Sequence, residues 1–545
     1  CLSGSDPKSF LIICVHIGFL FFFSFSPFLL FFDLYCLDCA IIASPLLTIC
    51  FVVPDAAIST IRTKRIAVCL LLFCMSDKIL KHLSDRALNR EIVAFHGLPI
   101  PDNVVRHDSP ISLSGGRPHY GFYPVTKISY EFLDEPFGEK TTSVEFNRLE
   151  PDHEAKLDLK RALNYGPTQG HSQLVKFCKE LLEFTSKPGY DDWDLTLTNG
   201  SGDSLHKVFN LLVNPGDVVL MECYTFVPVI HNIKAWGGEV VPVAMNFDDG
   251  GLDADALESL LENWSTGPYK EKPLPKALYT IPTGQNPTGL TLTEEKRKKV
   301  YELAQKYDFM IIEDDPYGMI QLGKYTDGVE NPFTPGSYTA ESFVKERLPR
   351  SYINLDTEGR VLRLETFSKV FAPGTRTGYI SGHSSLIKQI IKHANCSTRA
   401  ASGISQATLL AAIDKFGGAK GWVEWCIKVS KTYTDRKNVF LKTLFSSDAY
   451  KKGYFSVREP KAGMFITVEL NFPEGDDHRL ELEELNYKCV ERGVEVVLGK
   501  NMAFTPEYAK SAKFLRLTVA TQEDDAEIVE AASRLANSFS DYFDQ

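Results

Sequence analysis

Lys369 is the residue whose surroundings most clearly suggest chemistry in this sequence. It lies in the stretch ETFSKVFAPGTRTGY, residues 365–379, among small and hydroxyl side chains, and Arg376 follows it by seven residues. A nearby cation and burial both favour the neutral form of a lysine, and a neutral amine can attack a carbonyl carbon or carry a proton. Lys369 is therefore a candidate catalytic amine, and binding groups are expected around it.

A glycine-rich turn in the stretch TNGSGDSL, residues 198–205, is a candidate anion site. The turn opens a predicted helix, whose free N–H groups and dipole attract an anion such as a phosphate, and Ser201 can add a hydroxyl. Two observations weaken this interpretation. Such turns are often simple helix caps, and Asp203 would repel a phosphate unless its side chain points elsewhere.

Three further stretches place polar residues beside apolar runs. IPTGQNPTG contains Asn286 in a turn that follows a strand, which alone indicates only turn chemistry. FMIIEDDPYG sets Asp314 and Tyr317 after an apolar strand; acids there are usually solvated or bind a metal, but no supporting metal-ligand cluster is evident, so no metal is expected. KFLRLTVA puts Arg516 inside an apolar run, either as a charge on an edge strand or as a receptor for a carboxylate.

The elements that would position these residues alternate between apolar strand-like runs and helical periodicity. This alternation predicts an α/β fold with a mainly parallel sheet. Residues 194–213 predict a strand, a turn and a helix, because apolar residues recur at i, i+3, i+4 and i+7 from Leu205. Further candidate strands are residues 217–223, 277–282, 309–315, 360–367 and 378–382. Ligands of open α/β sheets bind beyond the carboxyl ends of the strands, so the polar residues at these ends can converge on one site.

Composition excludes some partners. The formal net charge of −11 and the pI of about 5.7 argue against nucleic acid, because no basic stripe offsets the negative field, and favour small molecules. The cysteines after residue 75 have no metal-ligand or CxxC spacing, which is typical of free thiols in a reducing compartment. They are Cys178, Cys223, Cys396, Cys426 and Cys489.

The first 74 residues differ from the rest of the chain. Residues 11–32 contain no Asp, Glu, Lys or Arg, which is long enough to span a bilayer, although Pro27 interrupts the run. We interpret residues 1–74 as translated non-coding sequence; a membrane anchor is the second interpretation and a cleaved presequence the third. Without this segment we expect a cytoplasmic protein, and with it a membrane-bound one.

The motifs together make the chain resemble the fold-type I pyridoxal-phosphate aminotransferases of class I and II, from about residue 80 to the C-terminus. Their order and spacing carry the resemblance: 28 residues separate Asn286 from Asp314, 55 separate Asp314 from Lys369, and 140 separate Arg376 from Arg516. The resemblance implies a large domain with a mainly parallel central sheet and a smaller α+β domain from the chain ends. The expected division is an N-terminal arm and part of the small domain at 75–160, the cofactor domain at 161–395 and the C-terminal small domain at 396–545.

The resemblance also implies a role for each candidate residue. Lys369 would bind the aldehyde of pyridoxal 5'-phosphate and, once displaced by substrate, move a proton. Asp314 would keep the pyridine nitrogen protonated, so that the ring accepts electrons when the Cα–H bond breaks. Asn286 and Tyr317 would hydrogen-bond the phenolic oxygen, and Tyr224 would stack on the ring.

The phosphate and substrate groups follow from the same comparison. The phosphate would be held by the backbone around Ser201 and Gly202, by Thr366 and Ser368, and by Arg376. Gly202 is a departure, because many relatives have a side chain there, so the phosphate cup would depend more on backbone groups. Tyr165 would reach the phosphate from the neighbouring subunit, which implies a homodimer with shared active sites. Arg516 would hold the substrate α-carboxylate.

Finer features resemble fungal aromatic-amino-acid and 2-aminoadipate aminotransferases. The stretch ISLSGGRPHYGFYPV, residues 111–125, places Gly115 and Gly116 beside the substrate, with Tyr120 and Phe122 available for apolar side chains. The implied reaction moves an amino group from an aromatic amino acid or 2-aminoadipate to 2-oxoglutarate, in aromatic amino acid metabolism or lysine biosynthesis. Two other classes stay open: another pyridoxal-phosphate enzyme, such as a β-lyase or decarboxylase, and a non-catalytic sensor.

Overall fold

The computed structural model describes residues 10–18, 47–54, 78–91, 103–105, 107–109, 111, 113, 116–149 and 157–545. The chain divides into two compact units, Cys1–Ser76 and Asp77–Gln545. In the first unit, β1 (Phe10–Gly18) and β2 (Leu47–Pro54) form an antiparallel pair. Residues 19–32 of the long apolar run lie outside the described residues. Within the described ranges, no helix is both long enough and apolar enough to span a bilayer.

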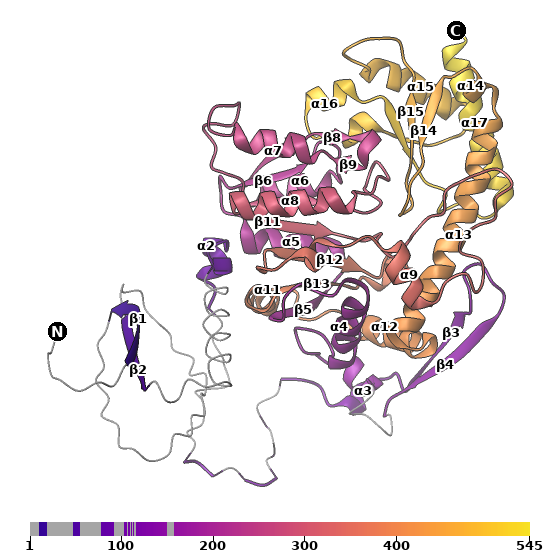
Figure 1. Cartoon of the computed structure of the whole chain (residues 1–545). Helices are drawn as coiled ribbons and strands as arrows, with labels where there is room; N and C mark the ends of the chain where they lie inside the picture. The colour runs from indigo at the N-terminus through magenta and orange to yellow at the C-terminus, as the bar shows by residue number, and fades with distance from the viewer. Residues whose placement is uncertain are drawn as a thin grey trace. The chain divides into compact units, whose positions relative to one another are not determined.

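A seven-stranded mixed sheet forms the centre of the second unit (Figure 1). The strand order is β5-β13-β12-β11-β10-β6-β7, and the antiparallel β13 pairs with β5 and β12, which makes β5 parallel to the other strands. The bounds are β5 Trp193–Thr198, β6 Val218–Glu222, β7 Glu239–Val243, β10 Ala277–Thr280, β11 Met310–Asp314, β12 Val361–Thr366 and β13 Gly378–His383. The predicted α/β fold and mainly parallel sheet are confirmed, and every predicted strand of the sheet forms within two residues of its expected bounds.

The alternation of side chains along the strands explains why helices cover both faces of this sheet. Successive residues of a strand point to opposite faces, so a strand buried on both sides is apolar throughout. In β6, Val219 and Met221 pack with α5 (Ser201–Leu212), α6 (Pro228–Ala235) and α11 (Ser384–Cys396). Val218 and Leu220 face α7 (Ala254–Glu262), α8 (Glu294–Tyr307) and α10 (Tyr352–Leu355) instead.

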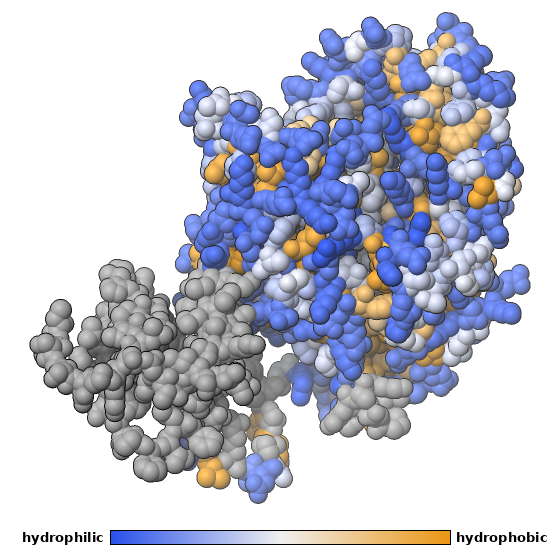
Figure 2. All heavy atoms as spheres, in the orientation of Figure 1, coloured by the Kyte–Doolittle hydropathy of each residue, from blue (hydrophilic) through white to orange (hydrophobic). Residues whose placement is uncertain are grey.

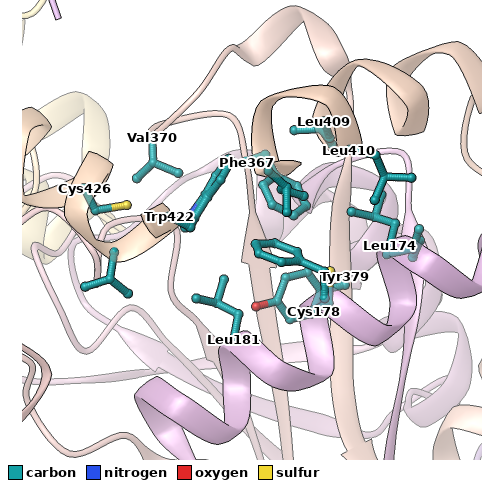
Figure 3. Packing of buried hydrophobic residues seen from close by; sticks show 14 of the residues in the cluster. Leu174, Cys178, Leu181, Phe367, Val370, Tyr379, Leu409, Leu410, Trp422 and Cys426 are labelled. Atoms are coloured by element: carbon teal, nitrogen blue, oxygen red, sulfur yellow. The ribbon is translucent and has the colours of Figure 1, made fainter. Parts of the chain in front are cut away.

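A third apolar cluster lies under the sheet edge that contains β5 and β13. Figure 3 shows Trp422 of α13 (Gly418–Ser446) among side chains of α4 (Ser172–Ser186), α12 (Gly403–Phe416) and the loop after β12. The Trp422 and Phe367 rings meet edge to face, with centroids 5.4 Å apart, a favourable aromatic geometry. This packing holds the loop after β12, because Phe367 and Val370 of that loop belong to the cluster and lie on either side of Lys369.

The smaller α+β part follows α12. Its sheet is antiparallel in the order β14-β15-β17-β16, with β14 Phe455–Arg458, β15 Ile466–Leu470, β16 Val497–Leu498 and β17 Phe514–Leu517. The helix α17 (Asp525–Phe543) packs against both α13 and α15 (Arg479–Glu491) beside it (Figure 1). Among the described N-terminal residues, Ile79, Leu83 and Ala87 pack into the large part next to α5, not into this sheet. The domain boundaries given above stay a prediction.

The remaining elements are short. Near the N-terminus of the second unit they are α2 Asp85–Leu88, η2 Tyr120–Phe122, β3 Lys127–Leu133, β4 Thr141–Asn147 and α3 Leu159–Ala162. Further along the chain they are β8 Met245–Asn246, η3 Phe247–Asp249, β9 Gly251–Leu252, α9 Ala340–Arg347, η4 Pro373–Thr375, α14 Asp448–Lys451, η5 Gly499–Met502 and α16 Pro506–Ser511. On the face of the second unit that Figure 2 shows, polar side chains predominate and apolar ones are scattered, as is usual for protein surfaces.

Candidate active site

The candidate site lies beyond the carboxyl edge of the large sheet. Ser201, Asn286 and Asp314 follow or end the parallel strands β5, β10 and β11, and Lys369 follows β12. Because these strands run in the same direction, their carboxyl ends meet at one edge, where ligands of such sheets bind. The convergence predicted from the sequence is confirmed for these strands.

Asp314 is a buried acid with one unoccupied oxygen. The Tyr279 hydroxyl donates a hydrogen bond of 2.7 Å to Asp314 Oδ2, while Oδ1 is buried without a partner among the described residues. Burial raises the pKa of Asp314 to about 7, the Tyr279 hydrogen bond opposes this rise, and the charge of Asp315 adds to it. A buried carboxylate oxygen without a hydrogen bond is costly, so this atom is suited to a ligand that donates a hydrogen bond to it.

Arg363 explains why Asp314, and not a neighbouring acid, is open to a ligand. Glu313 and Asp315 point to the sheet face opposite Asp314, because side chains alternate along β11 and the residue after it. Arg363 on β12 contacts Glu313 at 3.1 Å and Asp315 at 2.7 Å, and also pairs with Glu365 at 2.7 Å. Glu313, Asp315 and Glu365 each pair with one buried guanidinium on that face, and Asp314 is the acid on the other face.

The pKa of Lys369 is shifted in the direction that its predicted role requires. It is half-buried in the turn between β12 and η4. Its pKa is lowered, first by burial and then by the positive charges of Arg376 and Arg516. The sequence predicted the contribution of Arg376; that of Arg516 depends on the tertiary structure, because 140 residues separate the two arginines.

The N-terminus of α5 and Arg376 together form a positively polarised cup. Arg376 donates hydrogen bonds to the carbonyls of Asn199, at 3.1 Å, and Pro373, at 3.2 Å. Gly200, with φ of 88°, lets the guanidinium lie over the start of the helix, since a Cβ there would be 2.5 Å from Arg376 Nη2. The free N–H groups of α5 and this cation suit a phosphate.

Asp203 does not oppose an anion in this cup. Its Oδ2 accepts a hydrogen bond of 2.9 Å from the Asn199 N–H, and its other oxygen pairs with Lys207. Its charge is therefore compensated within α5. On the opposite side, the hydroxyls of Thr366 and Ser368 lie 2.9 Å apart at the end of β12. A Cβ on Gly202 would meet nothing within 4 Å, so that position of the cup is open.

Arg516 and Asn286 meet across the two parts of the second unit. Arg516 Nη1 donates a hydrogen bond of 2.9 Å to Asn286 Oδ1. The guanidinium lies over the Phe465 ring, 4.7 Å from its centroid, and Tyr317 meets that ring edge to face at 5.6 Å. Of the two interpretations left open by the sequence, the edge-strand charge is wrong, because β17 lies between β15 and β16 and Arg516 points to Asn286.

The comparisons with known proteins identify the family. The family model of aminotransferase class I and II matches residues 138–535. The chain belongs to this family. The Saccharomyces cerevisiae protein "Aromatic amino acid aminotransferase 2" is 37% identical over 494 residues, covering 85% of this chain and 95% of that protein. The crystal structure of the aromatic aminotransferase Aro9 from C. albicans has a TM-score of 0.80 and 40% identity, covering 85% of this chain and 98% of that one.

A more distant relative has a second type of substrate in its name. The mitochondrial kynurenine/alpha-aminoadipate aminotransferase of Mus musculus is 31% identical over 398 residues, covering 71% of this chain and 83% of that protein. Aminotransferases of this family use pyridoxal phosphate. The aminotransferase site fits this group, because an unpaired buried oxygen of Asp314 is available for the ring nitrogen and the Arg376 cup is available for the phosphate.

The structure encloses Tyr224 among aromatic side chains. Tyr224, only 7% exposed, packs edge to face against Phe514 with the centroids 5.0 Å apart, and its hydroxyl donates to the Tyr508 carbonyl at 2.9 Å. Burial raises its pKa to about 12. Asp314 and Asn286 are buried to a similar degree, so burial does not exclude Tyr224 from the site. The stacking of Tyr224 on the cofactor ring stays a prediction.

Replacing Tyr224 in two steps tests the stacking prediction. Tyr224→Ala is expected to weaken pyridoxal-phosphate affinity by about tenfold, because the cofactor ring loses its stacking partner. Tyr224→Phe keeps the ring, so it is expected to leave that affinity unchanged and to lower the free energy of unfolding by about 1 kcal/mol, since only a buried hydrogen bond is lost. Fluorescence titration of the apoenzyme and thermal melting measure the two quantities. Parental affinity in Tyr224→Ala would exclude the stacking role.

Gly200→Ala tests the phosphate cup. The added Cβ displaces the Arg376 guanidinium and strains a backbone with positive φ, so pyridoxal-phosphate affinity is expected to fall by at least about tenfold. Gly374→Ala is the matched control, because a Cβ there meets nothing within 4 Å. Equal affinities for the two variants, measured by titration of the apoenzyme, would exclude Arg376 from the cup.

Two other predicted residues are exposed in the single chain, and their roles stay predictions. Tyr165 is 77% exposed, and Gly116 is also exposed. Gly115 lies outside the described residues. The sequence reasoning missed Tyr279 and Arg363. A tyrosine within a strand buried on both faces is a signal for Tyr279, because its hydroxyl needs a partner, whereas the role of Arg363 has no sequence signal.

Proposed function

We propose that this aminotransferase moves the amino group of aromatic amino acids, of 2-aminoadipate, or of both, to 2-oxoglutarate. The observation that carries the proposal is the convergence of an amine with a lowered pKa, a buried acid with a free oxygen and an arginine suited to a carboxylate. These are Lys369, Asp314 and Arg516. The names of the relatives support the aromatic and aminoadipate substrates.

The residues of the chain divide the work. Bound pyridoxal phosphate supplies an electron sink for the bond broken at Cα. Lys369, whose pKa is lowered by burial and nearby cations, would take the Cα proton and return it. Arg516, oriented by Asn286, holds the α-carboxylate and so fixes which bond at Cα lies across the cofactor ring. Asp314 holds the ring nitrogen through its free oxygen.

Apolar and acidic substrates must share this site. Gly115 and Gly116 belong to the segment proposed to lie beside the substrate side chain, with Tyr120 and Phe122 for flat apolar groups. Phe122 is 79% exposed in the single chain, so a neighbouring subunit is needed to enclose it. The proposal of a homodimer therefore rests on the exposed Phe122 and Tyr165, whose ring would reach the phosphate of the partner.

The pathway and location are also proposals. Aromatic amino acid metabolism and lysine biosynthesis both fit the proposed substrates. The five cysteines after residue 75 are free thiols, and all of them except Cys396 are buried. Free thiols agree with a reducing compartment, and we propose the cytoplasm.

A panel of amino donors against 2-oxoglutarate and 2-oxoadipate tests the substrate proposal. We expect phenylalanine, tyrosine, tryptophan and 2-aminoadipate to be converted to their 2-oxo acids, with pyridoxamine phosphate formed on the enzyme. Ammonia and pyruvate from a β-substituted amino acid would indicate a β-lyase, and loss of carbon dioxide a decarboxylase. Absence of turnover with a bound cofactor would favour a sensor.

Arg516→Lys tests the carboxylate contact. We expect KM to rise by about tenfold or more for both amino and oxo acids, with a smaller change in kcat, because a point charge does not reproduce the two-pronged grip. Steady-state kinetics with one donor and one acceptor measure both constants. A rise in KM for only one of the two substrates would mean that Arg516 binds a substrate side chain and not the α-carboxylate.

A further inference from the structure

A small cavity lies beneath the loop that carries Lys369. Its volume is about 30 Å³, enough for about one or two water molecules. It is set between the sheet, α4 and α13, on the face opposite Asp314. Five of the side chains that line it are labelled in Figure 3: Leu181, Phe367, Val370, Tyr379 and Trp422.

Two acids bring an unpaired oxygen to this cavity. The Asp315 side chain, 5% exposed, accepts a hydrogen bond of 2.7 Å from Arg363 at Oδ2, while its Oδ1 is buried without a partner. Glu365 repeats this pattern: Oε1 accepts from Arg363 Nε at 2.9 Å and from Nη2 at 2.7 Å, and Oε2 has no partner. Both residues line the cavity. An anionic oxygen buried in this way is costly unless something donates to it.

Tyr379 adds a donor to the same cavity. It lies directly opposite Glu365 in the antiparallel pair of β12 and β13, so the two side chains share one face of the sheet. Its ring is 3% exposed, and its hydroxyl group points toward Leu181, another wall of the cavity (Figure 3). A phenol can donate one hydrogen bond to a group inside the cavity.

We infer that the cavity binds one structural water molecule, which donates its two hydrogens to Asp315 Oδ1 and Glu365 Oε2 and accepts one from the Tyr379 hydroxyl. A buried water typically makes about three hydrogen bonds to otherwise unsatisfied groups. The groups in the cavity match this number. The two hydrogens of the water go to the two unpaired carboxylate oxygens, and the water oxygen accepts the third hydrogen bond from the phenol.

A metal cation fits the cavity less well. Hard cations take six or more oxygen ligands. The unpaired oxygens that line the cavity are one each of Asp315 and Glu365. Tyr379 adds a hydroxyl, and much of the remaining wall is the carbon surface of Leu181, Phe367 and Trp422. The negative charge of the acids is also offset by Arg363.

The bound water links the two segments that hold the reactive groups. Asp315 directly follows Asp314, and Glu365 precedes the loop of Lys369 by four residues. The water therefore connects these segments on the face opposite the cofactor, in addition to Arg363. It acts as a positioning element and does not contact the substrate.

A high-resolution crystal structure of the full chain with pyridoxal phosphate tests the inference directly. We expect one isolated density peak in the cavity, about 2.6–3.0 Å from Asp315 Oδ1, Glu365 Oε2 and the Tyr379 hydroxyl. Crystals soaked in rubidium chloride provide the second arm. An anomalous rubidium peak in the cavity would identify a cation site, and an empty cavity would mean that the oxygens stay unpaired; either result overturns the inference.

Tyr379→Phe tests the hydrogen bond in solution. Loss of the phenolic donor is expected to lower the melting temperature of the holoenzyme by about 1–3 °C. Tyr338→Phe is the matched control, because Tyr338 packs against the same apolar cluster without lining the cavity, and it is expected to melt like the parent. Equal melting temperatures for Tyr379→Phe and the parent would overturn the assigned three-partner water.

Discussion

Replacing Lys369 by alanine is expected to lower transamination by about 10⁴-fold or more, because the site loses the group that both attacks the cofactor aldehyde and moves the proton at Cα. Cofactor binding is expected to persist at reduced affinity, since the phosphate cup at α5 and Arg376 is unchanged. Turnover assays, cofactor titration and borohydride trapping followed by peptide mapping measure the three effects.

Two variants sharpen this prediction. Lys369→Arg keeps a positive charge but cannot supply a neutral amine, so it is expected to be as inactive as the alanine variant. Lys392→Ala removes an exposed lysine of α11 and is expected to retain parental activity. Transamination by Lys369→Ala at a rate near that of the parent, or a trapped adduct on another lysine, would refute the assignment.

Replacing Asp314 by asparagine is expected to lower kcat/KM by about 10²–10³-fold while the fold is retained. The amide has nearly the same shape, but it lacks the charge that keeps the ring nitrogen protonated as electrons move into the ring. Burial raises the pKa of Asp314 because a buried carboxylate charge is costly. Asparagine carries no charge, so this cost is absent and the apo form of Asp314→Asn is expected to be at least as stable as the parent.

The sign of this stability effect follows from the direction of the shift. An acid whose folded pKa is raised binds a proton more strongly when folded, so it destabilises the fold as pH rises through the unfolded value of 3.8 toward 7. Asp314→Asn should therefore reduce the loss of apoenzyme stability between pH 4 and 7, measured by denaturant unfolding. Tyr279→Phe, which removes the hydrogen bond to Oδ2, is the graded variant and should lose less activity. An unchanged rate for Asp314→Asn would shift attention to Asp315.

The regular elements could be predicted because local patterns specify them. Strands such as 310–314 and 361–366 are short apolar runs bounded by turn residues, and the helix at 201–212 follows the 3.6-residue period from Leu205. The polar residue at the end of each strand marks the functional edge of a parallel sheet, so the site could be predicted at Asp314, Asn286 and Lys369 before any contact was known.

The contacts that the sequence does not show join distant segments. Tyr224 packs into the C-terminal core against Phe514, which is 290 residues further along the chain. Similarly, Arg363 selects Asp314 by pairing with the acids on either side of it, a choice made by the register of β11 with β12.

By itself the sequence determined the chemistry of this protein: an amine, an acid and an arginine at the ends of predicted strands, in an order and spacing that indicate an aminotransferase. The tertiary structure alone decided which acid lies on the sheet face opposite Arg363 and which arginines lower the pKa of Lys369. The physical reason is that local periodicity fixes the elements, whereas burial, pairing and charge are properties of side chains that meet only after the chain has folded.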